Sequence, residues 1–254
     1  MEKNNWQCLL FTGNSKSNCE AEMAASLSDL GKVTKIKLQP QLSDKVGIHT
    51  TLDVTELQEL LLKKDAVVFI PDAPDWKSSL ESLVENQLKE LTYVLNAAQT
   101  EGIPTFIFVS DIEGMGAAPR PLAIDESSLW SGQTNANDVQ KYWYLCEQEC
   151  RRAAEEGLNV LIIAAARMDN DPAHPRTHVY STSCAFLASS IKTVLTKKTD
   201  LQKIFVIQPS NLPNSMVTQE VKFPKWMFWK KAAPVNCVYF DFTSSKLFLS
   251  QDLN

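Results

Sequence analysis

The feature that most constrains the fold is a series of short apolar runs separated by longer segments with helical periodicity. The run Ala66–Ile70 (AVVFI) stands between Asp65 and Pro71 and contains no polar residue. A continuous apolar run of this length predicts a strand buried on both faces, as in parallel sheets. The other predicted strands are Gln7–Thr12, Val33–Leu38, Thr105–Ser110, Leu158–Ala164 and Lys203–Ile207.

Helices are predicted between these strands, at Ser17–Leu30, Val54–Lys63, Leu80–Thr100, Asp138–Glu156 and Thr182–Leu195. The longest has a predicted core stripe of Leu83, Leu88, Leu91, Leu95 and Ala98 and ends before Gly102. Strands that alternate with helices predict a doubly wound parallel α/β sheet. Such sheets bind ligands beyond the carboxyl ends of their strands. The candidate site is therefore the turn at Gly13, together with the loops after Ile70, Ser110 and Ala164.

Composition narrows the class of protein further. The chain has 254 residues, of which 44% are apolar, enough for a sizeable core and too many for intrinsic disorder. No apolar stretch approaches the roughly 18 residues of a membrane-spanning helix, and the polar N-terminus does not resemble a secretory signal. We therefore expect a cytoplasmic protein without a membrane span. The net charge of −5, with both signs well mixed, predicts no nucleic-acid surface.

Cysteine and histidine spacing predicts no metal site. The chain has six cysteines without a paired Cys-x-x-Cys set: Cys8, Cys19, Cys146, Cys150, Cys184 and Cys237. Free buried thiols are the favoured interpretation, including for Cys146 and Cys150, which share one face of a predicted helix. His174 and His178 are also four residues apart, but Pro175 interrupts any helix between them.

Several segments match a known family in their order and spacing. They are Phe11–Gly13, Asp53–Thr55, Asp65–Val68, Asn86–Ala98, Phe106–Ser110, Asp125–Trp130 (DESSLW), Trp143-Tyr144 and Phe240–Leu247. In this order they resemble the extended short-chain dehydrogenase/reductase superfamily. The nearest branch is that of the dihydroflavonol reductases, cinnamoyl-CoA reductases and NAD-dependent sugar epimerases. The resemblance implies a Rossmann-type sheet that binds a nicotinamide dinucleotide.

The family's phosphate-binding turn, Gly-x-x-Gly-x-x-Gly, is degenerate in this chain. Gly13 matches the first glycine, but Lys16 and Cys19 occupy the next two positions, where side chains are expected to crowd the phosphates. Lys35 and Lys37 stand where the family has an acid that binds a ribose hydroxyl. A 2′-phosphorylated dinucleotide would fit them better than NAD, although two exposed strand lysines are the favoured interpretation. We expect either no cofactor or residual NADP(H), with the binding candidates Gly13, Ser15, Lys16, Lys37, Asp53 and Val54.

The family's catalytic residues are also incomplete. Its tyrosine acts as general acid/base, and a lysine four residues later lowers the pKa of the phenol. The residues four positions after the tyrosines of this chain are Ala97, Cys146, Gln148, Cys184 and Thr243, so no Tyr-x-x-x-Lys exists. The family's catalytic hydroxyl falls at Asp111, with Ser110 beside it as a substitute. No complete catalytic set is predicted; the remnant candidates are Ser110, Asp111 and Tyr144, with Tyr142 as the alternative tyrosine.

The substrate-binding lobe of the family is reduced. Asp171-Pro172 stands at the turn that precedes this lobe in the family, and the next matching piece, His178-Val179, follows almost at once. We expect one domain over 1–254, with a Rossmann core in 1–172 and a reduced C-terminal part in 173–254. The tail Val238–Leu249 is predicted to hold one or two short strands or a strand and a turn.

Two further segments have both a functional and a structural interpretation. Lys222–Lys231 interleaves aromatic residues with lysines, which fits a membrane-surface or partner patch, although packing onto the sheet edge is favoured. Asp72, Asp75 and Trp76 follow the strand Ala66–Ile70, where a cofactor would lie in the family. A solvated loop with one packed tryptophan is the favoured interpretation of these three residues.

The leading hypothesis is a non-catalytic member of the superfamily that acts as a structural or interaction subunit. It predicts protein partners and allows a homo- or hetero-oligomer. One alternative is an NADP(H)-sensing regulator that grips part of the cofactor through Gly13, Asp53-Val54 and Ser110. Another is a working reductase or epimerase with atypical residues, using Tyr144 or Tyr142.

Overall fold

The computed structural model describes residues 6–13, 17–38, 54–72, 74, 77–111, 137–165, 184–197 and 204–207. Within them, six parallel strands form one sheet in the spatial order β2-β1-β3-β4-β5-β6. The chain runs outward from β1 to β2, returns to the other side of β1, and then continues strand by strand to β6. The strands are β1 Gln7–Gly13, β2 Lys32–Leu38, β3 Ala66–Ile70, β4 Phe106–Asp111, β5 Val160–Ala165 and β6 Ile204–Ile207.

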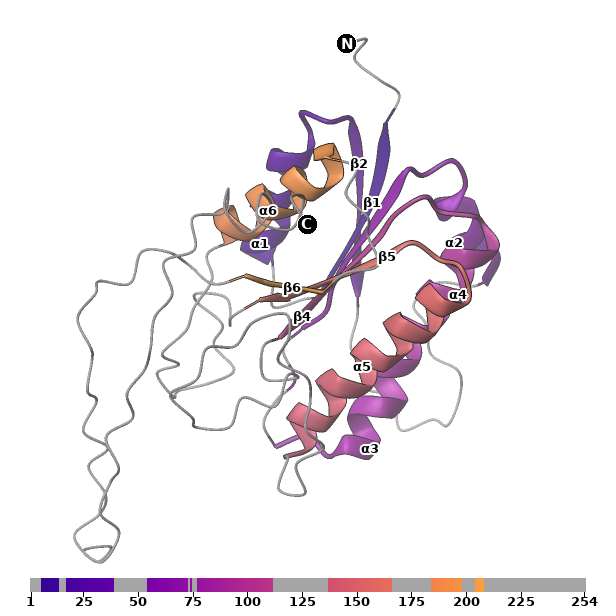
Figure 1. Cartoon of the computed structure of the whole chain (residues 1–254), viewed down its shortest axis with the longest axis vertical. Helices are drawn as coiled ribbons and strands as arrows, with labels where there is room; N and C mark the ends of the chain where they lie inside the picture. The colour runs from indigo at the N-terminus through magenta and orange to yellow at the C-terminus, as the bar shows by residue number, and fades with distance from the viewer. Residues whose placement is uncertain are drawn as a thin grey trace, which may run out of the picture.

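Helices cover both faces of this sheet, as Figure 1 shows. α1 and α6 lie side by side on one face, whereas α2, the α3–α4 segment and α5 lie on the other. The predicted doubly wound α/β fold is therefore confirmed. The helices are α1 Ser17–Leu27, α2 Val54–Leu61, α3 Leu80–Leu83, the π turn η2 Val84–Leu88, α4 Lys89–Thr100, α5 Asp138–Glu155 and α6 Cys184–Lys197.

Each face of the sheet has its own apolar core, because alternate residues of a strand point to opposite sides. All residues of β3 and β5 are buried, as continuous apolar runs predict. On the α5 side, the ring of Phe69 lies 5.8 Å from that of Phe11 and 6.2 Å from that of Phe108, between centroids. On the α1 side, aliphatic residues such as Leu10 and Val68 pack against Met23. Burial of such side chains stabilises the fold by about 1.5–3 kcal/mol each.

The segment 80–100 is one continuous helix whose second turn widens into the π turn η2. The predicted core stripe is confirmed at Leu83, Leu91, Leu95 and Ala98, which are buried. Leu88 is only partly buried, and Val94 is buried although it was not predicted. A π turn contains more residues than an α turn, so the face directed at the sheet shifts along the sequence after it.

The ends of the long helices follow the expected local chemistry. Asn137 caps α5 by accepting from the backbone of Gln140 at 2.8 Å, and the Gln140 side chain accepts from the Asn137 backbone at 3.1 Å. This reciprocal pair is a capping box. After α4 and α5, Gly102 and Gly157 adopt φ of 64° and 104°, the left-handed region that favours glycine. Both predicted helix ends are confirmed.

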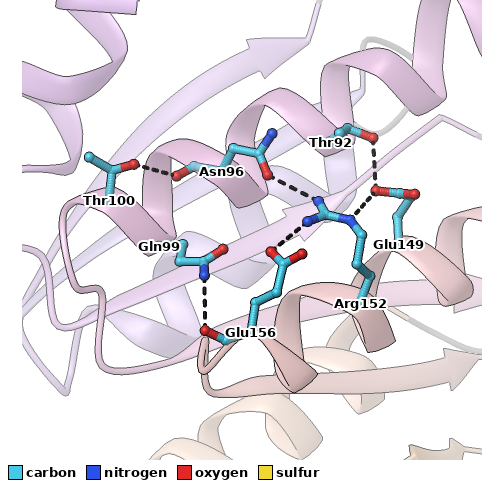
Figure 2. Close-up of polar contacts among 7 residues, drawn as sticks. All are labelled: Thr92, Asn96, Gln99, Thr100, Glu149, Arg152 and Glu156. Atoms are coloured by element: carbon cyan, nitrogen blue, oxygen red, sulfur yellow. Dashed lines mark hydrogen bonds and ion pairs between the residues drawn. The ribbon is translucent and has the colours of Figure 1, made fainter.

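A polar network on the outer surface joins α4 to α5 (Figure 2). Arg152 donates to Asn96 Oδ1 at 3.0 Å and pairs with Glu149 of α5 at 3.0 Å and with Glu156, the C-cap of α5, at 2.6 Å. Gln99 Nε2 donates to the backbone carbonyl of Glu156 at 3.0 Å. The network links α5 to α4, and α5 carries Tyr142 and Tyr144.

The predicted free thiols are confirmed where the structure describes them. Cys8, Cys19, Cys146 and Cys150 are buried, and Cys184 is half-buried. Burial raises the pKa of Cys8 to about 12, which makes its thiol a poor nucleophile. Cys237, His174, His178 and the ranges 222–231 and 238–249 lie outside the described residues.

The described ranges contain neither a membrane-spanning helix nor a metal-ion cluster. Among these residues, no helix has both the length and the apolar character that a membrane span requires. In the same part of the chain, no group of three or more His, Cys, Asp or Glu side chains is placed to hold a metal ion.

Candidate functional site

The candidate site is the carboxyl edge of the sheet at β1, where the strand order reverses. β1 lies between β2 and β3, with Gly13 paired to Leu38 on one side and Thr12 paired to Ile70 on the other. We call this place the switch point, because the chain forms β2 on one side of β1 and then β3 on the other side. Doubly wound sheets bind ligands at this position.

Asp72 packs directly over Gly13 at the switch point. A Cβ atom at position 13 would lie 2.2 Å from both Cγ and Oδ1 of Asp72 and 2.6 Å from its backbone nitrogen. No side chain fits there, so the space beside the glycine is filled by a carboxylate of the same chain. The sequence placed Asp72 in a solvated loop, whereas the structure shows it half-buried against β1.

A second carboxyl group lies near Asp72. Glu90, on α4, is half-buried. Burial, and then the charge of Asp72, raise the pKa of Glu90 to about 7. The charges of Glu90 and Asp72 both also raise the pKa of Tyr142, so the three groups share one region. Two acidic groups here favour a neutral or cationic neighbour over an anion.

The lysines of β2 are paired within the protein. Lys35 Nζ lies 3.1 Å from Glu20 Oε1, and Lys37 Nζ lies 3.8 Å from Glu20 Oε2. Glu20 belongs to α1, is only 7% exposed, and also accepts from Thr12 Oγ1 at 3.2 Å. Both lysines are exposed, as expected, but a buried carboxylate partly neutralises their charge.

The remnant serine lies in the protein interior. Ser110, in β4, is buried, and its Oγ donates to Glu147 Oε1 of α5 at 2.7 Å. Burial raises the pKa of Glu147, although the Ser110 hydrogen bond and nearby Arg151 lower it. The Ser110 hydroxyl is therefore engaged by α5. Asp111, the next residue, is half-buried at the end of β4.

Tyr142 and Cys146 occupy the spacing that the family reserves for tyrosine and lysine. Both are buried, and the Tyr142 hydroxyl forms a hydrogen bond with the Cys146 thiol. Burial first, and then Cys146, raise the pKa of Tyr142 well above 10. The Tyr142 ring also packs on Trp143, with centroids 5.2 Å apart. A phenol in this setting keeps its proton at neutral pH and is a poor general base.

The structure gathers only part of the predicted site. The predicted residues Gly13, Lys37, Ser110, Asp111 and Tyr144 lie at or near the carboxyl edge, and Tyr144 is half-buried on α5. Val54 is the first residue of α2. Ser15, Lys16 and Asp53 lie outside the described residues.

Sequence reasoning missed three acidic residues in this region, Glu20, Glu90 and Glu147, and it named Asp72 but favoured a solvated setting for it. The sequence did contain a signal that Asp72 lies near Gly13. Gly13 ends β1, Asp72 follows β3, and these two strands are neighbours in a doubly wound sheet. No comparable signal existed for Glu90 or Glu147. Each lies on a helix where an isolated acidic residue is most often solvated.

Solved structures of extended short-chain dehydrogenases and epimerases share this fold. One is a short-chain dehydrogenase/reductase superfamily protein from Agrobacterium tumefaciens with bound NAD, at 13% identity and a TM-score of 0.62, covering 80% of this chain and 78% of that one. Another is UDP-N-acetylglucosamine 4-epimerase from Bacillus cereus, at 15% identity and a TM-score of 0.58, covering 79% and 78%.

The terminal R domain of the myxalamid PKS-NRPS pathway also matches, at 13% identity and a TM-score of 0.62, covering 82% of this chain and 67% of that domain. No protein-family model and no curated protein sequence matches the chain. The predicted resemblance is therefore confirmed as a likeness of fold. The chain has the Rossmann-type sheet of the extended short-chain dehydrogenases and epimerases.

Proposed function

We propose that this chain is a non-catalytic protein of the extended short-chain dehydrogenase/reductase type that serves as a structural or interaction subunit. The observation that carries the proposal is the setting of Tyr142. Its hydroxyl is buried and hydrogen-bonded to Cys146, which stands four residues later, the spacing at which the family has its lysine. Without an ammonium group to lower its pKa, this phenol is unsuited to proton transfer.

The remaining catalytic positions support the same conclusion. The Ser110 hydroxyl is engaged by Glu147 in the interior, so it is not free to hold a substrate oxygen. Tyr144 remains as a second tyrosine, but Gln148 stands four residues after it in place of lysine. No other tyrosine of the sequence has a lysine at that spacing.

The packing of the C-terminal part supports a single domain over 1–254. α6 packs against α1, and Lys192 pairs with Asp29 at 2.6 Å. β6 extends the sheet beside β5. The described C-terminal elements thus complete the core, which suits a chain kept for its structure. We propose that its partners are proteins, in a homo- or hetero-oligomer.

The catalytic half of the proposal is tested with two assays on the purified full chain. Oxidation of NADH and NADPH is followed with aldehydes and ketones, with a working reductase as positive control. Epimerisation of UDP-sugars in the presence of NAD is followed by chromatography of the sugar nucleotides, with a working epimerase as positive control. We expect no rate above the protein-free reaction. Activity that disappears in Tyr142→Phe or Tyr144→Phe would contradict the proposal, because it would assign proton transfer to a tyrosine.

The subunit half is tested by the state of the native protein. Tagged full chain is isolated from its own cells, and its mass is measured by light scattering during size-exclusion chromatography. We expect a stoichiometric complex with itself or with another protein. A monodisperse monomer without a partner would contradict this half. Saturable NADPH binding without turnover would instead favour the sensing alternative, which the pairing of Lys37 with Glu20 does not favour.

A further inference from the structure

The fold implies a nicotinamide dinucleotide, and the residues at the switch point do not fit one. The turn after β1 is the phosphate-binding turn of such sheets. In this chain the first glycine of that turn is covered by the carboxylate of Asp72. We infer that Asp72 excludes the dinucleotide diphosphate from the switch point. This inference deepens the proposed function, on which it rests, by naming the residue that prevents cofactor binding.

The geometry gives the steric part of the argument. The atoms closest to a Cβ at position 13 are Cγ and Oδ1 of Asp72, both at 2.2 Å, and its backbone nitrogen at 2.6 Å. The Asp72 side chain therefore fills the space beside the glycine that ends β1. A diphosphate at the turn would have to displace this side chain from a packed position.

Charge gives the electrostatic part. A diphosphate carries negative charge, and Asp72 is an acidic residue at the end of the neighbouring strand. Glu90 lies close enough for Asp72 to raise its pKa, so an anion entering here meets a second acidic group. One like charge a few ångströms away lowers affinity roughly tenfold to a hundredfold near a protein surface.

Two cations that the structure describes beside β1 are engaged by another carboxylate. Lys35 and Lys37 lie on β2, next to β1, and both pair with Glu20 of α1. Glu20 is in turn held by the hydroxyl of Thr12, the residue before Gly13. An incoming phosphate would compete with a buried carboxylate for these ammonium groups. The described side chains on both sides of β1 therefore disfavour an anion.

The test compares two substitutions at Asp72 with a matched one at the opposite edge of the sheet. Asp72→Asn removes the charge and keeps the volume, whereas Asp72→Ala removes both. Asp65→Asn is the control: Asp65 precedes β3 as Asp72 follows it, and its Oδ2 accepts from the Gln7 backbone at 2.7 Å. Asp65→Asn removes one negative charge, as Asp72→Asn does, but at the amino edge of the sheet. Thermal unfolding first confirms that each full-length protein is folded.

NADH and NADPH are titrated into each protein and followed by nucleotide fluorescence and calorimetry. We expect no saturable binding to the wild type or to Asp65→Asn, and an affinity at least about tenfold above the wild-type limit for Asp72→Ala. The affinity of Asp72→Asn should lie between those of the wild type and Asp72→Ala. If Asp72→Ala does not fold, Asp72→Asn alone is compared with the wild type. Wild-type binding as tight as that of the Asp72 variants, or no gain in either variant, would overturn the inference.

Hydride transfer measured on the same samples separates this inference from the proposed function. Turnover by the wild type contradicts the proposed function. An inactive wild type whose Asp72 variants gain no binding contradicts only the inference. Variants that bind a dinucleotide and still transfer no hydride support both, because they recover the cofactor without recovering the catalytic tyrosine.

Discussion

Charged side chains are arranged in opposite ways in two regions of the molecule. One region is the outer surface of α4 and α5, and the other is the carboxyl edge at β1. On the outer surface, Arg152 lies between Glu149 and Glu156, so opposite charges meet in contact with solvent (Figure 2). At the carboxyl edge, Asp72 and Glu90 are both acidic and half-buried, and burial together with the charge of Asp72 raises the pKa of Glu90. The first region pairs opposite charges, whereas Asp72 and Glu90 bring two acidic groups together.

This contrast predicts which region makes the stability of the folded chain depend on pH. Exposed opposite pairs contribute little because water and salt screen them. Buried like charges shift pKa values, and such shifts change stability with pH. The carboxyl edge is where an enzyme of this fold would bind its cofactor, so the acidic groups there bear directly on the inferred exclusion of a dinucleotide.

The largest effect is expected for Gly13→Ala. The new Cβ would meet Asp72 at 2.2 Å and its backbone nitrogen at 2.6 Å, and the backbone cannot swing away as a side chain can. We expect a loss of about 3 kcal/mol in the free energy of unfolding, in the range of other overpacking substitutions. Urea denaturation monitored by circular dichroism measures this loss.

The double variant Gly13→Ala/Asp72→Gly serves as its control. Removing the Asp72 side chain takes away two of the three closest atoms and should recover part, but not all, of the lost stability. If Gly13→Ala costs nothing in the ligand-free protein, Asp72 is not packed over Gly13, and the contrast between the two regions fails.

The next effect concerns the pH dependence that Glu90 introduces. Its pKa is raised from 4.5 to about 7 in the folded protein, so the folded state binds a proton more readily than the unfolded state. Stability from this group is therefore greatest at low pH and falls as pH rises through the window from about 4.5 to 7. Glu90→Gln should remove this pH dependence. Its free energy of unfolding should match that of the wild type near pH 4 and exceed it by about 2 kcal/mol at pH 8.

Denaturation curves at several pH values measure this difference, and Glu149→Gln is the matched control. Glu149 lies in the α4–α5 network opposite Arg152, so its replacement should not stabilise the protein at any pH. A Glu90→Gln variant that is no more stable than the wild type at pH 8 would show that burial and the charge of Asp72 do not raise the pKa of Glu90.

Ser110→Ala is expected to cost about 1–2 kcal/mol, because it leaves the buried Glu147 carboxyl without its 2.7 Å hydrogen bond. The serine favours the ionised form of Glu147, so the loss should grow as pH rises. The same substitution in a Glu147→Gln background should cost less. Equal losses in both backgrounds, measured by chemical denaturation, would show that the serine does not act through Glu147.

The sequence predicted the sheet and its helices well because apolar runs and helical periodicity report burial directly. Ala66–Ile70 and the helix over 80–100 were found with the same bounds in the structure. The error at Leu88 came from the π turn, which no periodic pattern announces. Secondary structure and core were thus accessible from local pattern alone.

The site was less predictable because its contacts join residues far apart in the chain. Ser110 meets Glu147, and Gly13 meets Asp72, through the folded sheet. Sequence identified the absence of Tyr-x-x-x-Lys, which needs only spacing. It could not show that Tyr142 is buried against Cys146, because that depends on how α5 packs on the sheet.

The smallest effect is expected for Arg152→Met, on the outer surface of α4 and α5. Arg152 is 36% exposed, and its contacts with Glu149, Glu156 and Asn96 are screened by water. We expect a loss below about 1 kcal/mol that shrinks further as salt concentration rises. Arg152→Lys, which keeps the charge but not the planar fork of donors, should lose less at low salt. A salt-independent loss above about 2 kcal/mol would mean that this network is as strongly coupled to folding as the carboxyl edge, and the distinction between the two regions would fall.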